Sequence, residues 1–182
     1  LGALVSRNAT INYDNVFSLT RCVVTLVNPV DGEFESISAS SAALSVFNAN
    51  TSLPTQITFW GQQPVSEFEA VLRSVEYVHT GRNPSSETRN ITVTVTDTVG
   101  LTSISRTAFV SIALLNDAPE LSAGASGEAN FTTVYTEHAD PVSVASENAT
   151  LMDVDNTSLV SLIVTVLNAN DVSSDELVLD DA

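Results

Sequence analysis

Lysine is absent from the chain, and cysteine nearly so. All six cationic side chains are arginines, against 22 Asp and Glu, which gives a formal net charge of −16. A chain with so few cations has no basic patch for phosphates or an anionic leaflet, so we expect no nucleic-acid partner. The single cysteine excludes an internal disulfide and leaves the redox compartment open.

Long apolar runs are missing too. A membrane-spanning helix needs roughly 20 apolar residues, and no uncharged apolar run approaches that length, so we expect no membrane insertion. Yet 43% of the residues are hydrophobic, more than in a disordered acidic chain, so the chain folds. It opens Leu1-Gly2-Ala3 without Met or a leader pattern, and we expect a mature or excised piece of a longer protein.

Short runs of high strand propensity, separated by Gly, Pro, Asn and Asp, predict an all-β, mostly antiparallel fold. The expected strands are residues 22–27, 90–96, 107–112 and 159–167. One segment has a helical period instead, because its apolar side chains recur three and four residues apart. It predicts one short helical turn near 64–72, with an apolar face formed by Phe68, Val71, Leu72 and Val75.

An internal repeat is the most informative feature. Residues 8–28 match residues 148–168, with one residue inserted before an Asp-Asn pair, and Glu35 then aligns with Glu176. The matching positions are Asn8, Thr10, Asp14, Asn15, Leu19, Val24, Thr25 and Asn28, with Asn148, Thr150, Asp155, Asn156, Leu159, Val164, Thr165 and Asn168. The chain therefore contains about 1.3 copies of a unit of about 140 residues. The first copy is 1–118, either complete or without its first strand, and 119–182 is the incomplete beginning of the next.

The two parts differ in charge. Residues 119–182 hold 12 acids and no cation, a charge of −12, whereas 1–118 hold 10 acids and six arginines, a charge of −4. Between them, Leu115-Asn116-Asp117-Ala118-Pro119 has the features of a short joint, because Pro119 keeps Ala118 extended and donates no hydrogen bond.

Two segments resemble a known family. LNDAPEL at 115–121 is similar to the linker of cadherin-like repeats, and 68–100 resembles the second half of a cadherin-like or dystroglycan-type unit. In that half Arg89 opens the longest strand, which closes on Asp97-Thr-Val-Gly100. The resemblance implies an immunoglobulin-like β-sandwich, repeated in tandem on a large extracellular protein. It identifies a fold more firmly than an activity.

Calcium is the one cofactor that the resemblance suggests, and none is required. Calcium takes six to eight oxygen ligands, and the implied candidates are Asp97, Asn116, Asp117, Asp153 and Asp155. The family pattern is reduced, since no Asp-Arg-Glu occurs and the Asp153–Asn156 element shrinks to Asn12-Tyr13-Asp14-Asn15 in the first unit. The alternative is that these Asp and Asn side chains close turns by bonding their own backbone.

Six Asn-x-Ser/Thr sequons are candidate sites for N-linked glycans in a secreted eukaryotic chain. They are Asn8, Asn50, Asn90, Asn130, Asn148 and Asn156. Asn8 and Asn148 occupy equivalent repeat positions, which is consistent with one modification per unit. Asn156 conflicts with the calcium interpretation, because one side chain does not easily serve both as glycan anchor and in a metal site.

Other chemical groups favour structural roles. Cys22 aligns with Leu162, so a buried hydrophobe is expected there. Trp60 is expected in the core or between sheets, although a sugar-stacking platform is the alternative. His79 and His138 are expected at the surface or in turns, because neither has a second ligand at zinc spacing.

The carboxylates predict no catalytic site. Glu33 with Glu35, or Glu67 with Glu69, resemble acid/base pairs in spacing, but no nucleophile or oxyanion donor accompanies them, so solvated carboxylates are expected. Arg89 is expected to pair with a nearby acid such as Glu87 or Glu76.

These features predict a non-catalytic structural repeat of an N-glycosylated extracellular fibre or cell-surface filament. Its expected partners are neighbouring copies of itself or adjacent repeats, together with N-linked glycans. Because 1–42 and 141–182 are equivalent, a neighbouring subunit can donate the strands that the second unit lacks, giving head-to-tail assembly. The alternative is a calcium-dependent cell-adhesion module that binds a protein or glycan partner.

Overall fold

The structure is a computed structural model, and it describes residues 3–5, 7–12, 18–170 and 174–179. The chain divides into two compact units, 1–115 and 116–182. The division falls within the segment 115–119. None of the helices in the described residues is long and apolar enough to cross a bilayer.

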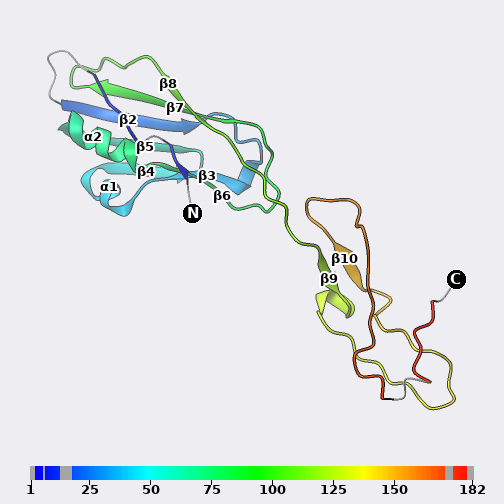
Figure 1. The fold of residues 1–182 in the computed structure, drawn as a ribbon. Helices are drawn as coiled ribbons and strands as arrows, with labels where there is room; N and C mark the ends of the chain where they lie inside the picture. The colour runs from blue at the N-terminus through cyan, green and yellow to red at the C-terminus, as the bar shows by residue number, and fades with distance from the viewer. Residues whose placement is uncertain (1–2, 6, 13–17, 171–173, 180–182) are drawn as a thin grey trace. The chain divides into compact units, whose positions relative to one another are not determined.

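The first unit is built on a five-stranded antiparallel sheet (Figure 1). In spatial order its strands are β4 (Asn48–Leu53), β5 (Gln56–Pro64), β2 (Ser18–Leu26), β7 (Arg89–Asp97) and β8 (Arg106–Val110). Three of the four predicted strands are therefore present, as β2, β7 and β8. β2 lies in the middle and is hydrogen-bonded to β5 on one edge and β7 on the other.

A second, three-stranded antiparallel sheet completes the first unit. Its order is β1 (Ala3–Leu4), β6 (Glu76–His79) and β3 (Glu35–Ser38). The mostly antiparallel β architecture predicted from the sequence is confirmed.

Two short helices lie beside each other in the first unit (Figure 1). The helix predicted near 64–72 is confirmed as α2 (Val65–Arg73), which follows Pro64 and buries Phe68, Val71 and Leu72. The sequence prediction missed α1 (Ser41–Val46), whose first turn is capped by Ser40, with its hydroxyl accepting from the Ala43 amide at 3.2 Å. A helix of one and a half turns is too short to have a recognisable apolar period.

The core of the first unit is a single apolar cluster from both sheets and α2. Cys22 is buried there, as its repeat partner Leu162 suggests, and burial raises the pKa of its thiol to about 12. The expectation for Trp60 is wrong: Phe59 is 0% exposed, whereas Trp60 is 40% exposed on the opposite side of β5. Side chains alternate along a strand, so Phe59 facing the core turns Trp60 outward.

The second unit has little regular structure. A short antiparallel pair joins β9 (Glu120–Ser122) to β10 (Thr150–Met152), and a 3-10 turn spans Ala125–Gly127. Of its described residues only Gly124 is buried, so the unit has no core of its own. The strand predicted at 159–167 is absent, and these residues have no regular secondary structure.

Candidate functional site

Arg89 is the centre of a buried polar network in the first unit. It is the first residue of β7 and is 0% exposed. Its Nε donates to Glu35 Oε1, its Nη2 donates to Asp31 Oδ2, and its Nη1 donates to the carbonyls of Ser85 and Glu87. The predicted pairing with the Glu87 or Glu76 carboxylate is wrong, because the acidic partners in the fold are Asp31, in the loop before β3, and Glu35, the first residue of β3.

Glu35 is the acid that Arg89 holds. It is the first residue of β3 and 0% exposed, so the expectation of a solvated Glu33–Glu35 pair is wrong for Glu35. Its carboxylate also accepts from the Tyr77 hydroxyl at 2.6 Å and from the Asp31 amide at 2.9 Å. Burial alone would raise its pKa, but the bonds from Tyr77, Arg89 and Asp31 outweigh burial and hold the Glu35 pKa below its ordinary value.

Tyr77 and Arg89 respond to the same contacts. Burial and the Glu35 carboxylate together raise the pKa of the Tyr77 phenol. Burial by itself would lower the pKa of Arg89, but Glu35 outweighs it and raises that pKa. Near neutral pH these shifts keep Arg89 protonated, Glu35 ionised and Tyr77 neutral.

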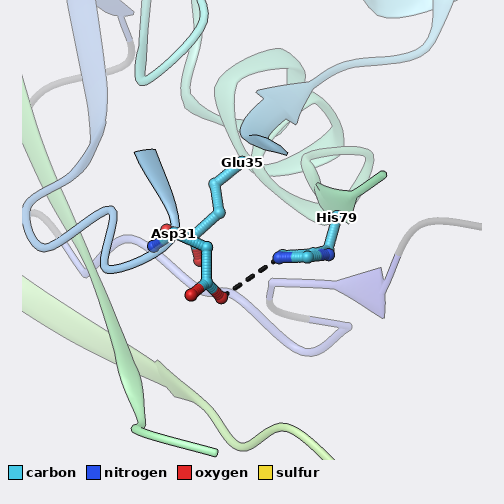
Figure 2. A group of neighbouring side chains, drawn as sticks. All are labelled: Asp31, Glu35 and His79. Carbon is cyan, nitrogen blue, oxygen red and sulfur yellow. Dashed lines mark hydrogen bonds and ion pairs between the residues drawn. The ribbon is translucent and has the colours of Figure 1, made fainter. Parts of the chain in front are cut away.

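Asp31 and His79 complete the network at its edge. Figure 2 shows the His79 ring and the Asp31 carboxylate facing each other, with Nε2 of His79 3.1 Å from Oδ2 of Asp31. Asp31 also accepts from the Ser85 amide at 2.9 Å. Burial raises the pKa of Asp31, but the Ser85 amide, His79 and Arg89 together lower it below its ordinary value. The prediction of a surface or turn position is wrong for His79, which lies in β6, whereas His138 is exposed.

The same residues have the composition of a metal site. Asp31, Glu35 and His79 each offer a ligand atom within 4.8 Å of the others, the one such group of three in the described residues. However, the Arg89 guanidinium already bonds both carboxylates, so a divalent cation would meet its positive charge. The geometry therefore supports a structural ion pair that ties β3 and β6 to the start of β7.

The calcium candidates divide between the two units. Asp97 is buried at the end of β7 in the first unit, and its Oδ1 accepts from the amides of Val99 and Leu101, both at 2.9 Å. At this position the turn-closing alternative fits the geometry. Gly100 supports the turn with φ of 90°, a conformation that favours glycine.

The other four candidates gather in the second unit. The Asp117 amide donates to Asp155 Oδ2, and the Asn156 side-chain amide donates to Asn116 Oδ1 at 3.0 Å and to Asp153 Oδ1 at 3.2 Å. Asp153 Oδ1 also closes its own turn by accepting from the backbone amides of Asp155 and Asn156, both at 2.9 Å. The structure thus brings Asn116, Asp117, Asp153 and Asp155 together. The corresponding first-unit element, 12–15, lies mostly outside the described residues.

The six sequon asparagines differ in accessibility. Five are exposed (Asn8, Asn50, Asn130, Asn148 and Asn156), whereas Asn90 is half-buried on β7. Asn156 is exposed but its amide nitrogen is already used by Asn116 and Asp153. Asn50 lies on the outer face of the five-stranded sheet, beside Trp60.

No family model, curated protein or solved structure matches this chain. The cadherin-like resemblance therefore remains a prediction from the residues.

Proposed function

We propose that the chain is a non-catalytic structural repeat of an N-glycosylated extracellular fibre or cell-surface filament, which extends by strand pairing between neighbouring copies or adjacent repeats. In this proposal the first unit is a cadherin-like, immunoglobulin-like β-sandwich. Its support is the order of elements that the family resemblance implies: a helix before a strand containing Tyr77, then a long strand opened by Arg89 and closed at Asp97–Gly100.

The observation that carries the proposal is that the apolar residues of 159–167 are exposed and form no strand. They are the repeat equivalent of β2, the central strand of the first unit. On β2 the inward side chains Leu19, Cys22, Val24 and Leu26 are buried, whereas the equivalents Leu159, Leu162, Val164 and Val166 are all exposed. Within the described part of the second unit, no strand pairs with 159–167.

Completing this strand would remove apolar side chains from water. Burying an aliphatic side chain contributes about 1.5–3 kcal/mol when it starts fully exposed, so four half-exposed ones contribute on the order of 4 kcal/mol. Ordering the backbone opposes this gain, which is why strand pairing on both edges is needed as well. An extended segment of this kind, with apolar side chains and no strand paired to either edge, can add to the sheet of a neighbouring chain.

Polar positions specify what the partner strand contains. In the first unit Asn28 fixes β7 to the end of β2, because its Nδ2 donates to the Thr88 carbonyl at 3.0 Å and its Oδ1 accepts from the Asn90 amide at 2.6 Å. In the second unit Asn168 is the repeat equivalent of Asn28. Glu176 is the repeat equivalent of Glu35, the residue that pairs with Arg89 in the first unit. Residues 119–182 contain no cation. In this proposal the arginine that pairs with Glu176 therefore comes from another segment, one that corresponds to β7.

Analytical ultracentrifugation and negative-stain microscopy of the full chain, combined with hydrogen exchange, test the proposal. We expect concentration-dependent assembly with amide protection at 159–167. Leu162→Lys, at the position equivalent to buried Cys22, should abolish both, because a lysine there enters an apolar interface. Val134→Lys is the matched control, since Val134 is 81% exposed in the same unit but lies outside the segment. Isolated monomers at high concentration and near-neutral pH, with 159–167 unprotected, refute self-assembly.

A calcium-dependent adhesion module is the second candidate. It is favoured by the gathering of Asn116, Asp117, Asp153 and Asp155. In that case calcium should raise the melting temperature, and Asp117→Ala or Asp155→Ala should remove the increase while the exposed Glu137→Ala retains it. No response to calcium in a thermal titration favours the passive fibre instead.

A further inference from the structure

Trp60 is the single tryptophan of the chain, and it faces outward from β5. It lies in a shallow hollow on the outer face of the five-stranded sheet. The hollow is lined by Arg21, Asn50, Gln56, Thr58 and Trp60. Tryptophan is enriched at interfaces, where its ring meets an apolar surface while its N–H remains near water or a polar partner.

Strand register places a sequon beside this indole. Asn50 is paired with Thr58, and Trp60 is paired with Asn48 on β4 and with Arg21 on β2. Asn50 and Trp60 are therefore diagonal neighbours on one face, a separation of about 7–8 Å that long side chains bridge. The Asn50 Oδ1 accepts from the Ser52 amide at 2.9 Å, which orients its exposed side-chain amide.

We propose that Asn50 carries an N-linked glycan whose first sugar rings pack on the Trp60 indole, with the Arg21 guanidinium donating to sugar hydroxyls. This inference rests on the proposed function, because it needs passage through the secretory pathway. The donor is a lipid diphosphate-linked oligosaccharide. The Asn50 Nδ2 forms a bond to C1 of the first sugar and loses a proton, while the C1–oxygen bond to the diphosphate breaks and the lipid diphosphate leaves. No oxidation or reduction occurs.

The same face carries a second pair of this kind. Asn90 on β7 is directly opposite Phe109 on β8, and Phe109 is 72% exposed. Two sequons of the first unit are thus each next to an exposed aromatic ring. Both lie on the outer face of the sheet, one toward the β4 edge and the other toward the β8 edge. The aliphatic faces of sugar rings cover such rings, whereas their hydroxyls remain in water, so this arrangement suits a solvated covalent glycan.

The proposal is tested on the full chain secreted from eukaryotic cells. Ser52→Ala removes the sequon but keeps Asn50 and the Ser52 backbone amide, and Thr132→Ala removes the Asn130 sequon of the second unit as the matched control. Glycopeptide mass spectrometry measures occupancy, and the lone tryptophan reports its own environment. We expect Asn50 to be occupied, with blue-shifted Trp60 emission and about twofold weaker acrylamide quenching than in Ser52→Ala. Thr132→Ala should match the wild type.

A second measurement distinguishes contact from mere proximity. Trp60→Ala should leave Asn50 occupancy unchanged but speed the release of that glycan by peptide-N-glycosidase under native conditions. A vacant Asn50 beside occupied sequons elsewhere overturns this inference alone, as does an occupied Asn50 with Trp60 emission and quenching equal to those of Ser52→Ala. Vacancy at all six sequons instead overturns the glycosylated fibre, so the two failures are distinguishable.

Discussion

Replacing Arg89 by methionine should destabilise the first unit more than any exposed substitution. The change keeps most of the side-chain volume but removes the cation from between Glu35 and Asp31. Glu35 then keeps the bonds from Tyr77 and the Asp31 amide while its negative charge stays buried. The carbonyls of Ser85 and Glu87 also lose their donor.

The magnitude follows from this geometry. Removing one partner of a buried ion pair typically costs 3–5 kcal/mol, because the remaining charge is uncompensated. Arg89 and Glu35 are both fully buried, so we expect about 3–5 kcal/mol for Arg89→Met. For a unit of this size about 1 kcal/mol lowers the melting temperature by roughly 4 °C, which predicts a decrease of about 12–20 °C. Arg106→Met, at an exposed arginine on β8, should change the free energy of unfolding by less than about 0.5 kcal/mol.

Acidification should reduce the deficit of Arg89→Met. Without the guanidinium, burial raises the pKa of Glu35, and protonation then removes the uncompensated charge. The wild-type pair stays ionised over the same range, because its Glu35 pKa is lowered. Denaturant unfolding of both proteins at pH 7.5 and pH 5 therefore should show a smaller difference at pH 5. The reasoning is refuted by a loss below 1 kcal/mol at pH 7.5, or by a deficit that grows on acidification.

Three further outcomes follow from the first unit. Since Glu35 and Asp31 have lowered pKa values, their stabilisation is present above their unfolded values of about 4 and lost as the pH falls through the folded ones, so the free energy of unfolding should be flat from pH 7 to about 5 and fall below about 4. Phe68→Ala should cost about 3–5 kcal/mol in denaturant unfolding, because Phe68 is fully buried with its ring centroid 4.6 Å from that of Phe47, whereas exposed Phe109→Ala should cost little. Gly100→Ala should cost about 1–2 kcal/mol in the same assay through its φ of 90° alone, since no atom lies within 4 Å of the added methyl group; an unchanged midpoint contradicts this.

Local pattern was enough to predict much of the first unit. Apolar spacing placed α2 and its buried face, and runs of strand-forming residues placed β2, β7 and β8, because these signals depend on neighbours within one element. The repeat also predicted the burial of Cys22. Each of these features is decided by which residues alternate or recur along a short stretch of chain.

Contacts between residues far apart in the sequence could not be predicted in this way. Glu35 and Asp31 lie 54 and 58 positions from Arg89, so nearby acids such as Glu87 were the natural sequence choice. Only the tertiary structure, which places the start of β3 and the loop before it against the start of β7, brought these residues together. Trp60 was misplaced for a similar reason. The alternation of side chains along a strand predicts that Trp60 and Phe59 point to opposite faces of the sheet. Which of these faces is covered by the core depends on the tertiary structure.

Residues 159–167 show most clearly the difference between what the sequence predicts and what the tertiary structure determines. Their sequence predicts a central strand that is apolar on both faces and equivalent to β2. Whether such a sequence becomes a strand depends on tertiary structure, because a central strand is formed by the hydrogen bonds and side chains of a neighbour on each edge. β2 has β5 and β7, whereas the described second unit offers 159–167 neither, and the same pattern is left exposed.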